Sequence, residues 1–365
     1  MAHAATCAVI GGGLVGMSVA LGLVRANLRV VLFDEGDLAL RASRGNFGLI
    51  WVQAKGVKAG HYSLWTQKAA RAWPEFARNL QELSGIDVAY VNDGGILVAM
   101  DDDELQNYND ILSNIAARDE DFAFTMLDHA TMRQYLPGLG PTIPGGSFSP
   151  YDGHVNPLRL LHALHRGFIA LGGEYRPHSP ITIISGDVGD FRIPQGDQVV
   201  QASKIVFCAG LGNSRFAEFF DLATPIAPVH GQIMVSEPIA PCLRVPTNII
   251  RQTDEGVIQI GYSQDNRGFD TEVAQDTSAI IARNALRIFP WLENLRLVRQ
   301  WGALRIMPRD GLPIYGQSST HKGVYTINCH SGVTLASLHA TMVAEWIAND
   351  MPHPLIDAFS HRRFA

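Results

Sequence analysis

The sequence predicts an α/β fold in which a parallel-sheet domain is interrupted by an inserted α+β domain with an antiparallel sheet. Three observations predict it. A strand, a glycine-rich turn, a helix and a second strand occupy residues 7–33. Strand-rich segments fill much of the middle of the chain, and residues 323–347 contain a strand, a turn of small residues and a helix. Because the first and last units have the composition of parallel βα units, we expect them to join in one sheet.

Composition and charge exclude several classes of function. A chain of 365 residues is long enough for two domains, and a net charge of -6 gives no sign of a nucleic-acid partner. The four cysteines lack CxxC spacing, so we expect no metal site and no iron–sulfur cluster. We find no transmembrane apolar run and no secretory leader pattern. These features predict a cytoplasmic protein, with peripheral contact to the inner membrane left open.

The first βα unit carries a nucleotide-binding pattern. Gly11, Gly13 and Gly16 have GxGxxG spacing after an apolar strand, and the second strand ends at Asp34 and Glu35. The three glycines permit a tight turn, close approach to a pyrophosphate, and packing of the helix on the strand. The helix N-terminus attracts phosphates, and Asp34 can accept hydrogen bonds from ribose hydroxyls. The unit predicts a bound adenine dinucleotide without a 2′-phosphate, and leaves FAD and NAD open.

The segment after the second strand, residues 41–51, leaves two interpretations open. It is rich in small and polar residues and then becomes apolar. It fits an ordinary loop, or a segment that places backbone N–H groups and the side chains of Ser43 or Asn46 against the dinucleotide.

Local patterns define the next elements. Apolar residues recur at helical spacing over 61–83, which predicts a helix whose tryptophans pack in the core. Residues 89–100 predict two strands around an Asn-Asp-Gly-Gly turn, and residues 101–121 predict an acidic surface helix. Pro157 is expected to open a further helix at its first position.

Three later segments complete the pattern. Residues 181–185 predict a strand, and residues 204–216 predict a strand, a glycine turn and a helix. Residues 248–263 predict a hairpin with Asp-Glu-Gly at its turn. The last helix is expected over about residues 334–347.

The order of these pieces resembles the FAD-dependent amino-acid oxidoreductase family that includes D-amino-acid oxidase, glycine oxidase and sarcosine oxidase. The resemblance covers essentially the whole chain. It rests on the segments VIGGGLVGMS, VLFDEG, DGHVNPLRLLHAL, IVFCAGLGNS, PVHGQI, IQIGYSQDNRGFD, WGALRIMPRDGLPIYG and NCHSGVTLASLHATMVAEWI. The stretch SRGNFGLIWVQAKG is most similar to the catalytic (β) subunits of bacterial opine dehydrogenases of the octopine and nopaline type, and the hydroxyproline and proline dehydrogenase subunits are also close.

This resemblance implies a two-dinucleotide-type FAD-binding (Rossmann-like) domain and non-covalent FAD. The implied FAD-binding domain is discontinuous and covers residues 1–85, 146–222 and 305–365, and the substrate domain covers residues 86–145 and 223–304. Besides the glycines and acids of the first motif, the implied cofactor-binding residues are Ser43, Arg44, Asn46, Ala209, Gly210, His330, Gly332, Val333, Thr334 and Leu335.

The resemblance also implies the substrate contacts. Arg305 stands where glycine oxidase and its relatives have the arginine that binds the substrate carboxylate. The motif departs from the family, because Gly302-Ala303 replaces Ala-Gly and Ile306-Met307 replaces Pro-Gly. The shape of the pocket next to Arg305 is therefore open.

A second arginine is a further candidate. Ile249 stands at a position that faces the substrate in glycine oxidase, and Arg251 shares its strand face because strand positions i and i+2 point the same way. Arg251 could bind the second carboxylate of an opine, or it could pair with Asp254 or Glu255 at the turn. Tyr262 is a weaker candidate for the pocket wall.

The implied reaction is oxidation of the C–N bond of an amino acid or a secondary amine such as an opine. Arg305 would hold the carboxylate, a hydride would pass to flavin N5, and the imine would hydrolyse to an oxo-acid and an amine. No catalytic base is predicted, because a neutral amine needs none, and His330 is expected to order the flavin loop.

The implied setting is a dehydrogenase complex with a larger redox partner subunit. In some relatives a histidine that aligns with Pro157 carries covalent FMN, so covalent FMN is not expected here, while FMN shared at a subunit interface stays open. The alternatives are a hydroxyproline or proline dehydrogenase subunit, a stand-alone glycine- or sarcosine-type oxidase that makes peroxide, and a flavin-binding assembly subunit without turnover.

Overall fold

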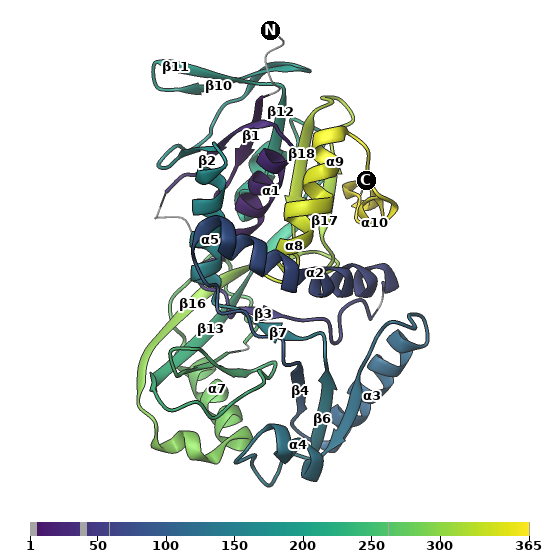
Figure 1. The fold of residues 1–365 in the computed structure, drawn as a ribbon, viewed down its shortest axis with the longest axis vertical. Coiled ribbons are helices and arrows are strands. Elements are labelled where there is room, and N and C mark those ends of the chain that lie inside the picture. The colour runs from purple at the N-terminus through teal and green to yellow at the C-terminus, as the bar shows by residue number, and fades with distance from the viewer. Residues whose placement is uncertain (1–5, 37–41, 58, 262, 365) are drawn as a thin grey trace.

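The computed structural model describes residues 6–36, 42–57, 59–261 and 263–364. Its upper part in Figure 1 is a six-stranded sheet with the strand order β17-β18-β12-β1-β2-β8. These strands are β1 (Thr6–Ile10), β2 (Arg29–Phe33), β8 (Glu174–Arg176), β12 (Lys204–Phe207), β17 (Ile314–Gln317) and β18 (Val324–Asn328). All neighbouring pairs are parallel except β17 with β18. The first and last predicted units therefore join in one sheet.

Helices cover one face of this sheet and a small hairpin sheet covers the other. The covering helices are α1 (Leu14–Arg25), α5 (Pro157–Ala170), α8 (Ala336–Leu338), α9 (Ala344–Asn349) and α10 (Pro354–Asp357). The hairpin sheet is β9 (Ser185–Asp187), β10 (Asp190–Gln195) and β11 (Gln198–Ala202), and the short helix α6 (Ser214–Ala217) packs on the same face as this sheet. Figure 1 shows α1, α5 and α9 side by side on the near face of the sheet. Apolar residues of the far face pack against Phe191 and Ile193 of β10. Both faces of the sheet are thus shielded from water, which agrees with the continuous apolar composition of these strands.

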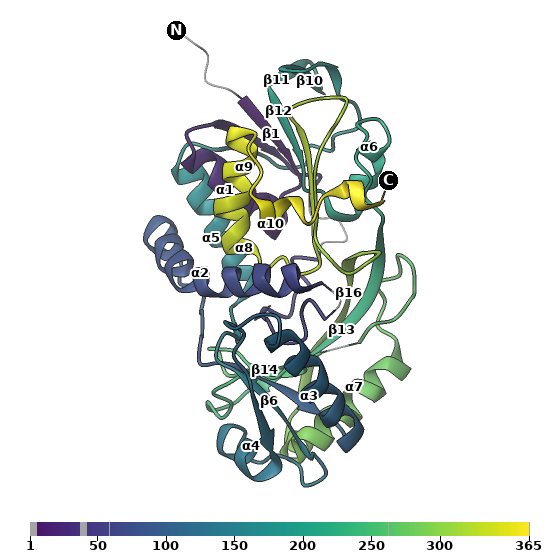
Figure 2. The same cartoon turned by 90° about the vertical axis from the view of Figure 1, so that its right-hand side faces the viewer.

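The helix predicted over residues 61–83 is α2 (Gly60–Ser84), which crosses the middle of the molecule (Figure 2). Trp65 and Trp73 are fully buried, which confirms their predicted core role. Each indole N–H is also satisfied, since Trp65 Nε1 donates to Tyr315 Oη and Trp73 Nε1 donates to the Thr334 carbonyl. The predicted helix start at Pro157 is confirmed, with Asn156 Oδ1 accepting from two backbone N–H groups of its first turn.

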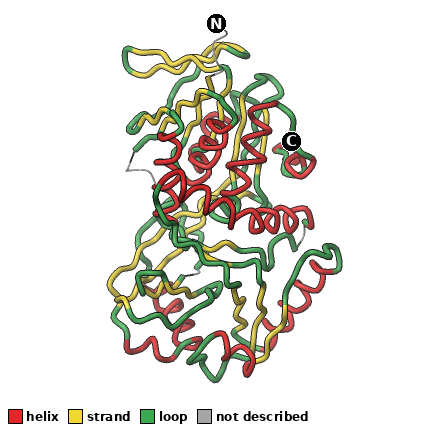
Figure 3. The backbone as a smooth tube through the Cα atoms, in the orientation of Figure 1, coloured by secondary structure: helices red, strands yellow, loops and turns green. Residues whose placement is uncertain are grey.

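The lower part of the molecule is built on two antiparallel sheets. One has the order β4-β6-β5 and the other β14-β15-β13-β16. The elements of this part are β4 (Gly95–Ala99), α3 (Asp102–Ala116), β5 (Thr125–Asp128), α4 (His129–Tyr135), β6 (Gly145–Ser149), β13 (Ile226–Pro238), β14 (Ile250–Gln252), β15 (Val257–Ile260), α7 (Gln275–Ile288) and β16 (Leu297–Pro308). The long strands β13 and β16 run from the parallel sheet down into this part (Figure 2). The tube in Figure 3 shows the same contrast, with helices concentrated in the upper part. The predicted acidic helix and the predicted hairpin are confirmed as α3 and as β14 with β15.

Two local predictions are corrected. The two strands predicted in residues 89–100 do not pair, because Val91 forms a bridge with His154 while β4 pairs with β6. The fully buried β4 takes a partner that shares its core, and the turn cannot override that packing. The helix predicted over 334–347 begins at Ala336, contains a π-helical turn at His339–Val343 and ends at Asn349.

Two of the domain boundaries expected from the sequence fall inside strands of the structure. The edge between residues 145 and 146 runs through β6, whose partners β4 and β5 lie in the proposed substrate domain. The edge between 304 and 305 runs through β16. In the part of the chain that the structure describes, no helix is both long and apolar enough to cross a membrane.

Candidate functional site

A cavity of about 410 Å³ lies between the parallel sheet and the strands β13 and β16. Its wall at one end is the start of α1, and at the other end it is Arg305 and the residues around it. The lining residues that the sequence singled out are Ser43, Asn46, Arg305, His330, Gly332, Val333 and Thr334. The short strands β3 (Leu49–Ile50) and β7 (Gly153–His154) pair beside it and position the segment that follows Ile50.

The glycine turn is packed as tightly as its motif predicts. Gly11 has a φ of 110°, and a Cβ atom on Gly16 would lie 1.9 Å from the Gly11 carbonyl oxygen. The Asp34 carboxylate accepts hydrogen bonds from Gly12 N at 2.6 Å and Gly36 N at 2.9 Å. These contacts fix the turn at the N-terminus of α1, where no side chain caps the helix from its N-cap residue, Gly13.

Neighbouring residues complete this end of the cavity. Ser43 Oγ accepts from Leu14 N at 2.9 Å, which ties the segment after β2 to the first turn of α1. Residues 42–51 therefore contact the first turn of α1 through Ser43, and their contact with a dinucleotide stays a prediction. Glu35 and Arg44 are exposed, while Asp34 is buried.

Ala209 and Gly210 lie beside the glycine turn and outside the cavity lining. A Cβ atom on Gly11 would lie 2.7 Å from Ala209 Cα, and Gly210 has a φ of 58° and packs against Ile306. Leu335 is fully buried in the core below the loop 329–334. Ala209, Gly210 and Leu335 therefore pack against residues near the cavity and are not part of its lining.

The loop 329–334 presents its inner side to the cavity because its outer side is held by hydrogen bonds. Tyr62 Oη and Ser331 Oγ are 2.8 Å apart, and Thr334 Oγ1 accepts from Trp51 N at 3.1 Å. Burial, and then the charges of Lys55 and Arg305, lower the pKa of His330 to about 3, so its ring is neutral at working pH. Burial raises the pKa of Cys329 to about 12, so it is a thiol.

Arg305 lines the cavity from β16. Its guanidinium lies over Gly231 of the paired strand β13, where an added Cβ atom would be 2.3 Å from Nη1. Nη1 also donates to the Ser263 carbonyl. A planar, permanently charged group held in this way suits bidentate binding of a carboxylate.

Arg251 takes a different place from the one expected. It is fully buried, its Nη1 donates to His154 Nδ1 at 2.9 Å, and its guanidinium carbon lies 5.7 Å from the centre of the Phe47 ring. Neither Arg251 nor Ile249 is among the described residues that line the cavity, although Asn248 is. Burial lowers the pKa of Arg251 to about 10.

The alternative partners of Arg251 are occupied elsewhere. Asp254 and Glu255 form ion pairs with Arg159 at 2.7 and 2.6 Å. Tyr262, the weaker candidate for the pocket wall, lies outside the described residues. Outside the loop 329–334, sequence reasoning missed five polar residues of the lining, namely Gln53, Lys55, Tyr108, Asn248 and Gln264. Lys55 stands in the segment WVQAKG that carried part of the resemblance, but nothing in that segment indicates the direction of its side chain.

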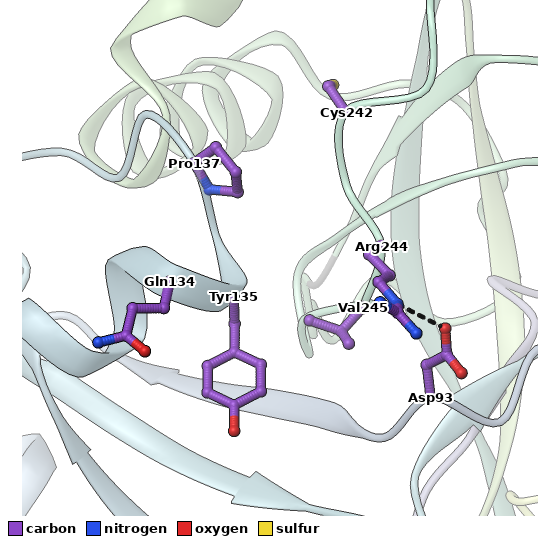
Figure 4. Close-up of a pocket in the computed structure, with 7 residues that line it drawn as sticks. All are labelled: Asp93, Gln134, Tyr135, Pro137, Cys242, Arg244 and Val245. Atoms are coloured by element: carbon purple, nitrogen blue, oxygen red, sulfur yellow. Dashed lines mark hydrogen bonds and ion pairs between the residues drawn. The ribbon is translucent and has the colours of Figure 1, made fainter.

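A second hollow of about 620 Å³ lies between α4 and the segment 242–245, at the opposite end of the molecule from α1 (Figures 1 and 4). In Figure 4, Tyr135 faces Val245 and Arg244 across it. Arg244 Nε pairs with Asp93 at 3.0 Å, and its side chain is largely exposed. This hollow brings together no set of groups for redox chemistry, and within the described ranges no three His, Cys, Asp or Glu residues cluster as a metal site would.

Comparison with known proteins decides the cofactor. Residues 6–346 match the family described as DAO, FAD dependent oxidoreductase. The chain belongs to this family. The cavity fits FAD, because the start of α1, whose N-cap residue Gly13 has no side chain to cap it, can receive the pyrophosphate and the inner side of loop 329–334 can receive the flavin ring. FAD is therefore the cofactor of this FAD-dependent oxidoreductase.

Individual relatives cover nearly the whole chain. The protein is 40% identical over 358 residues to a subunit of the opine oxidase of Agrobacterium tumefaciens (strain Ach5), in a match that covers 98% of this chain and 96% of that protein. It is 38% identical over 358 residues to the corresponding opine oxidase subunit of Rhizobium meliloti, with the same coverage of 98% and 96%. The crystal structure of glycine oxidase from Geobacillus kaustophilus superimposes with a TM-score of 0.85 at 22% identity, over 94% of this chain and 95% of that one. That superposition confirms the predicted fold.

Proposed function

We propose that this FAD-dependent oxidoreductase oxidises the C–N bond of an opine, a secondary amine that carries two carboxylates. The observation that carries the proposal is the Arg305 guanidinium, which lies in the same cavity as the flavin loop 329–334. Two relatives at 40% and 38% identity are named as subunits of opine oxidases, which supports the choice of amine.

Each described residue of the site has a physical part in the proposed reaction. Arg305 holds the α-carboxylate and so directs the neighbouring α-carbon toward the flavin, which would accept a hydride from it while the amine nitrogen loses a proton. Gly231 leaves room for the guanidinium, and the Ser263 carbonyl fixes its direction. Positioning of this kind lowers the barrier without a protein acid or base.

The neutral state of His330 fits this proposal. An imidazole with a pKa of about 3 offers a hydrogen-bond donor and an acceptor, and adds no charge that would compete for the carboxylate. His330 is a residue that orders the loop, and it takes no proton from the substrate at neutral pH. The imine product then hydrolyses to an oxo-acid and an amine.

The proposal includes a partner. We propose that a larger redox subunit takes the electrons, which makes the chain the catalytic subunit of a cytoplasmic dehydrogenase complex. The naming of the two opine oxidase relatives as subunits supports a complex. Transfer to dioxygen by the isolated chain is the alternative, and peroxide formation compared with dye reduction distinguishes them.

The test is an anaerobic titration of the FAD-loaded protein, followed by loss of visible flavin absorbance. Octopine and nopaline should reduce the flavin of the wild type. Arg305→Ala should lower the second-order rate of reduction by about 100-fold or more, because it removes a bidentate charged contact. Arg299→Ala is the matched control, since it removes an exposed arginine from the same strand.

The outcomes separate the candidate activities. Flavin reduction by proline or hydroxyproline alone would move the assignment to that type of dehydrogenase, and reduction by glycine or sarcosine alone would move it to a small-amine oxidase. If Arg305→Ala is reduced as fast as the wild type, the carboxylate lies elsewhere and the proposal fails.

A further inference from the structure

The described charged side chains that line the cavity are all positive. Arg305 and Lys55 both line it, and no aspartate or glutamate does so among the described residues. His330, the histidine of the lining, is neutral. Two cations that share a small cavity repel each other. Burial is the main cause that lowers the pKa of Lys55; electrostatic interactions with Asp152 and Cys329 oppose this shift, and the charge of Arg305 adds to it. Such a pair is stable when an anionic ligand lies between the two charges.

The Lys55 side chain projects from a well-defined turn. Lys55 N donates to the Val52 carbonyl at 3.1 Å, and Ala54 has a φ of 57°. Positive φ is uncommon for a residue with a Cβ atom and marks a backbone that its surroundings determine strongly. The turn is anchored from below, because Val52 N donates to Asp152 Oδ1 at 2.6 Å. The backbone at Lys55 is thus fixed beside the cavity by the hydrogen bonds of this turn.

The charge of Asp152 raises the pKa of Lys55 and so partly offsets its burial, but the hydrogen bonds that the Asp152 carboxylate accepts come from other groups. Asp152 is fully buried, and its second oxygen accepts from Gln53 Nε2 at 2.7 Å. Burial, opposed by these hydrogen bonds, raises the pKa of Asp152 to about 7. Within the described part of the chain, the Lys55 ammonium makes no hydrogen bond and no ion pair. Lys55 is partly buried, and a buried ammonium is costly unless an anion meets it.

We propose that Lys55 is the second anion-binding residue of the cavity and determines specificity for dicarboxylic substrates. Arg305 binds one carboxylate of the amine and Lys55 binds the other. The identity of the amine rests on the proposed function, whereas the requirement for two carboxylates rests on the two cations of the lining. Arg251 does not serve this role, because its guanidinium is directed at His154 behind Phe47.

The first experiment measures binding without turnover. The FAD-loaded protein is titrated by calorimetry with oxydiacetate, a dianion that has no amine to oxidise, and with methoxyacetate, its monoanionic counterpart. Lys55→Gln should weaken the binding of oxydiacetate by about 10- to 100-fold, because one charge-assisted hydrogen bond is lost. Binding of methoxyacetate should change less than about 3-fold, and Lys55→Arg should restore most of the preference for the dianion.

The second experiment uses turnover with a matched pair of amines. Octopine has two carboxylates, and N2-ethyl-L-arginine lacks the one on its carboxyethyl arm. Lys55→Gln should raise the KM for octopine by about 10-fold or more and leave the KM for the monocarboxylate unchanged. Lys68→Gln, which removes an exposed charge from α2, should change neither value and is the control.

The results separate the two proposals. If Lys55→Gln leaves the ratio of dianion to monoanion affinity unchanged, whether both affinities fall or neither does, Lys55 has a structural role and the inference is overturned. If that ratio falls while no opine reduces the wild-type flavin, the inference stands and the proposed opine activity fails.

Discussion

The cavity has two walls that the chain builds in different ways. The nucleotide wall consists of the glycine turn 11–16 and the loop 329–334, and the substrate wall consists of β13, β16 and the turn 51–57. The nucleotide wall rests on a parallel sheet covered on both faces, and Gly11 and Gly16 pack closely against backbone atoms. The substrate wall presents long polar side chains from antiparallel strands and a turn. We therefore expect the nucleotide wall to be sensitive to any side chain added at its glycines. The substrate wall should be sensitive to the charge and direction of its polar side chains.

The largest effect is expected from a methyl group in the nucleotide wall. Gly16→Ala places a Cβ atom within 1.9 Å of the Gly11 carbonyl oxygen, which neither backbone segment can avoid without moving. We expect loss of bound FAD and destabilisation by roughly 3 kcal/mol or more. Flavin absorbance of the purified protein and urea denaturation measure both. Gly60→Ala is the control, because a Cβ atom there meets nothing within 4 Å. Retention of FAD by Gly16→Ala would show that this wall tolerates change.

A methyl group in the substrate wall should act differently. Gly231→Ala would collide with the Arg305 guanidinium, which is the end of a flexible side chain and can move away. We expect full FAD content and a Tm close to the wild type. The second-order rate of flavin reduction by octopine should fall about 10-fold, since a displaced guanidinium loses one of its two hydrogen bonds to the carboxylate. Loss of FAD in this variant would contradict the separation of the two walls.

A further expected effect concerns acid stability behind the nucleotide wall. His339 is fully buried, its Nε2 lies 3.0 Å from Tyr315 Oη, and its Nδ1 has no hydrogen-bond partner among the residues that the structure describes. Burial lowers the pKa of His339 to about 3 from an ordinary value of 6.5. Because the folded pKa is the lower one, this histidine stabilises the fold above pH 6.5, and that contribution is lost as the pH falls from 6.5 towards 3.

His339→Gln should remove this part of the pH dependence. The free energy of unfolding of the wild type should fall relative to the variant by about 1.4 kcal/mol per pH unit below pH 6.5. Urea denaturation of the FAD-loaded proteins at pH 8 and pH 5 gives the difference. Parallel pH profiles for the two proteins would show that His339 does not titrate on unfolding.

The sequence predicts the nucleotide wall much better than the substrate wall. GxGxxG spacing reports a local backbone requirement, so β1, α1 and β2 are predicted almost to their observed ends. Helical spacing likewise predicts α2, because one face of that helix is buried along its whole length. These signals are local, and a single sequence contains them in full.

The direction of the substrate-wall side chains is set by distant partners. Ile249 and Arg251 were expected to face the substrate, but β14 begins at Ile250, and Ile249 belongs to a turn in which its N–H donates to Thr247 Oγ1. The register of β14 with β15 then turns Arg251 toward His154, which lies 97 positions earlier in the chain. The turn that carries Lys55 is held by the hydrogen bonds that Asp152 accepts from Val52 N and Gln53 Nε2. Pairings over such separations leave no trace in local composition.

The strand order of the parallel sheet also has a consequence for synthesis. β1 pairs with β2 early, but its other neighbour is β12, and the loop that completes the flavin site follows β18. At a translation rate of about 5–20 residues per second, roughly 15 s to a minute separates the emergence of β1 from that of β18. Until β12 emerges, one edge of an apolar strand lacks its partner. We therefore expect FAD to bind after most of the chain has left the ribosome, so that FAD supply governs maturation of the finished chain and not its early folding.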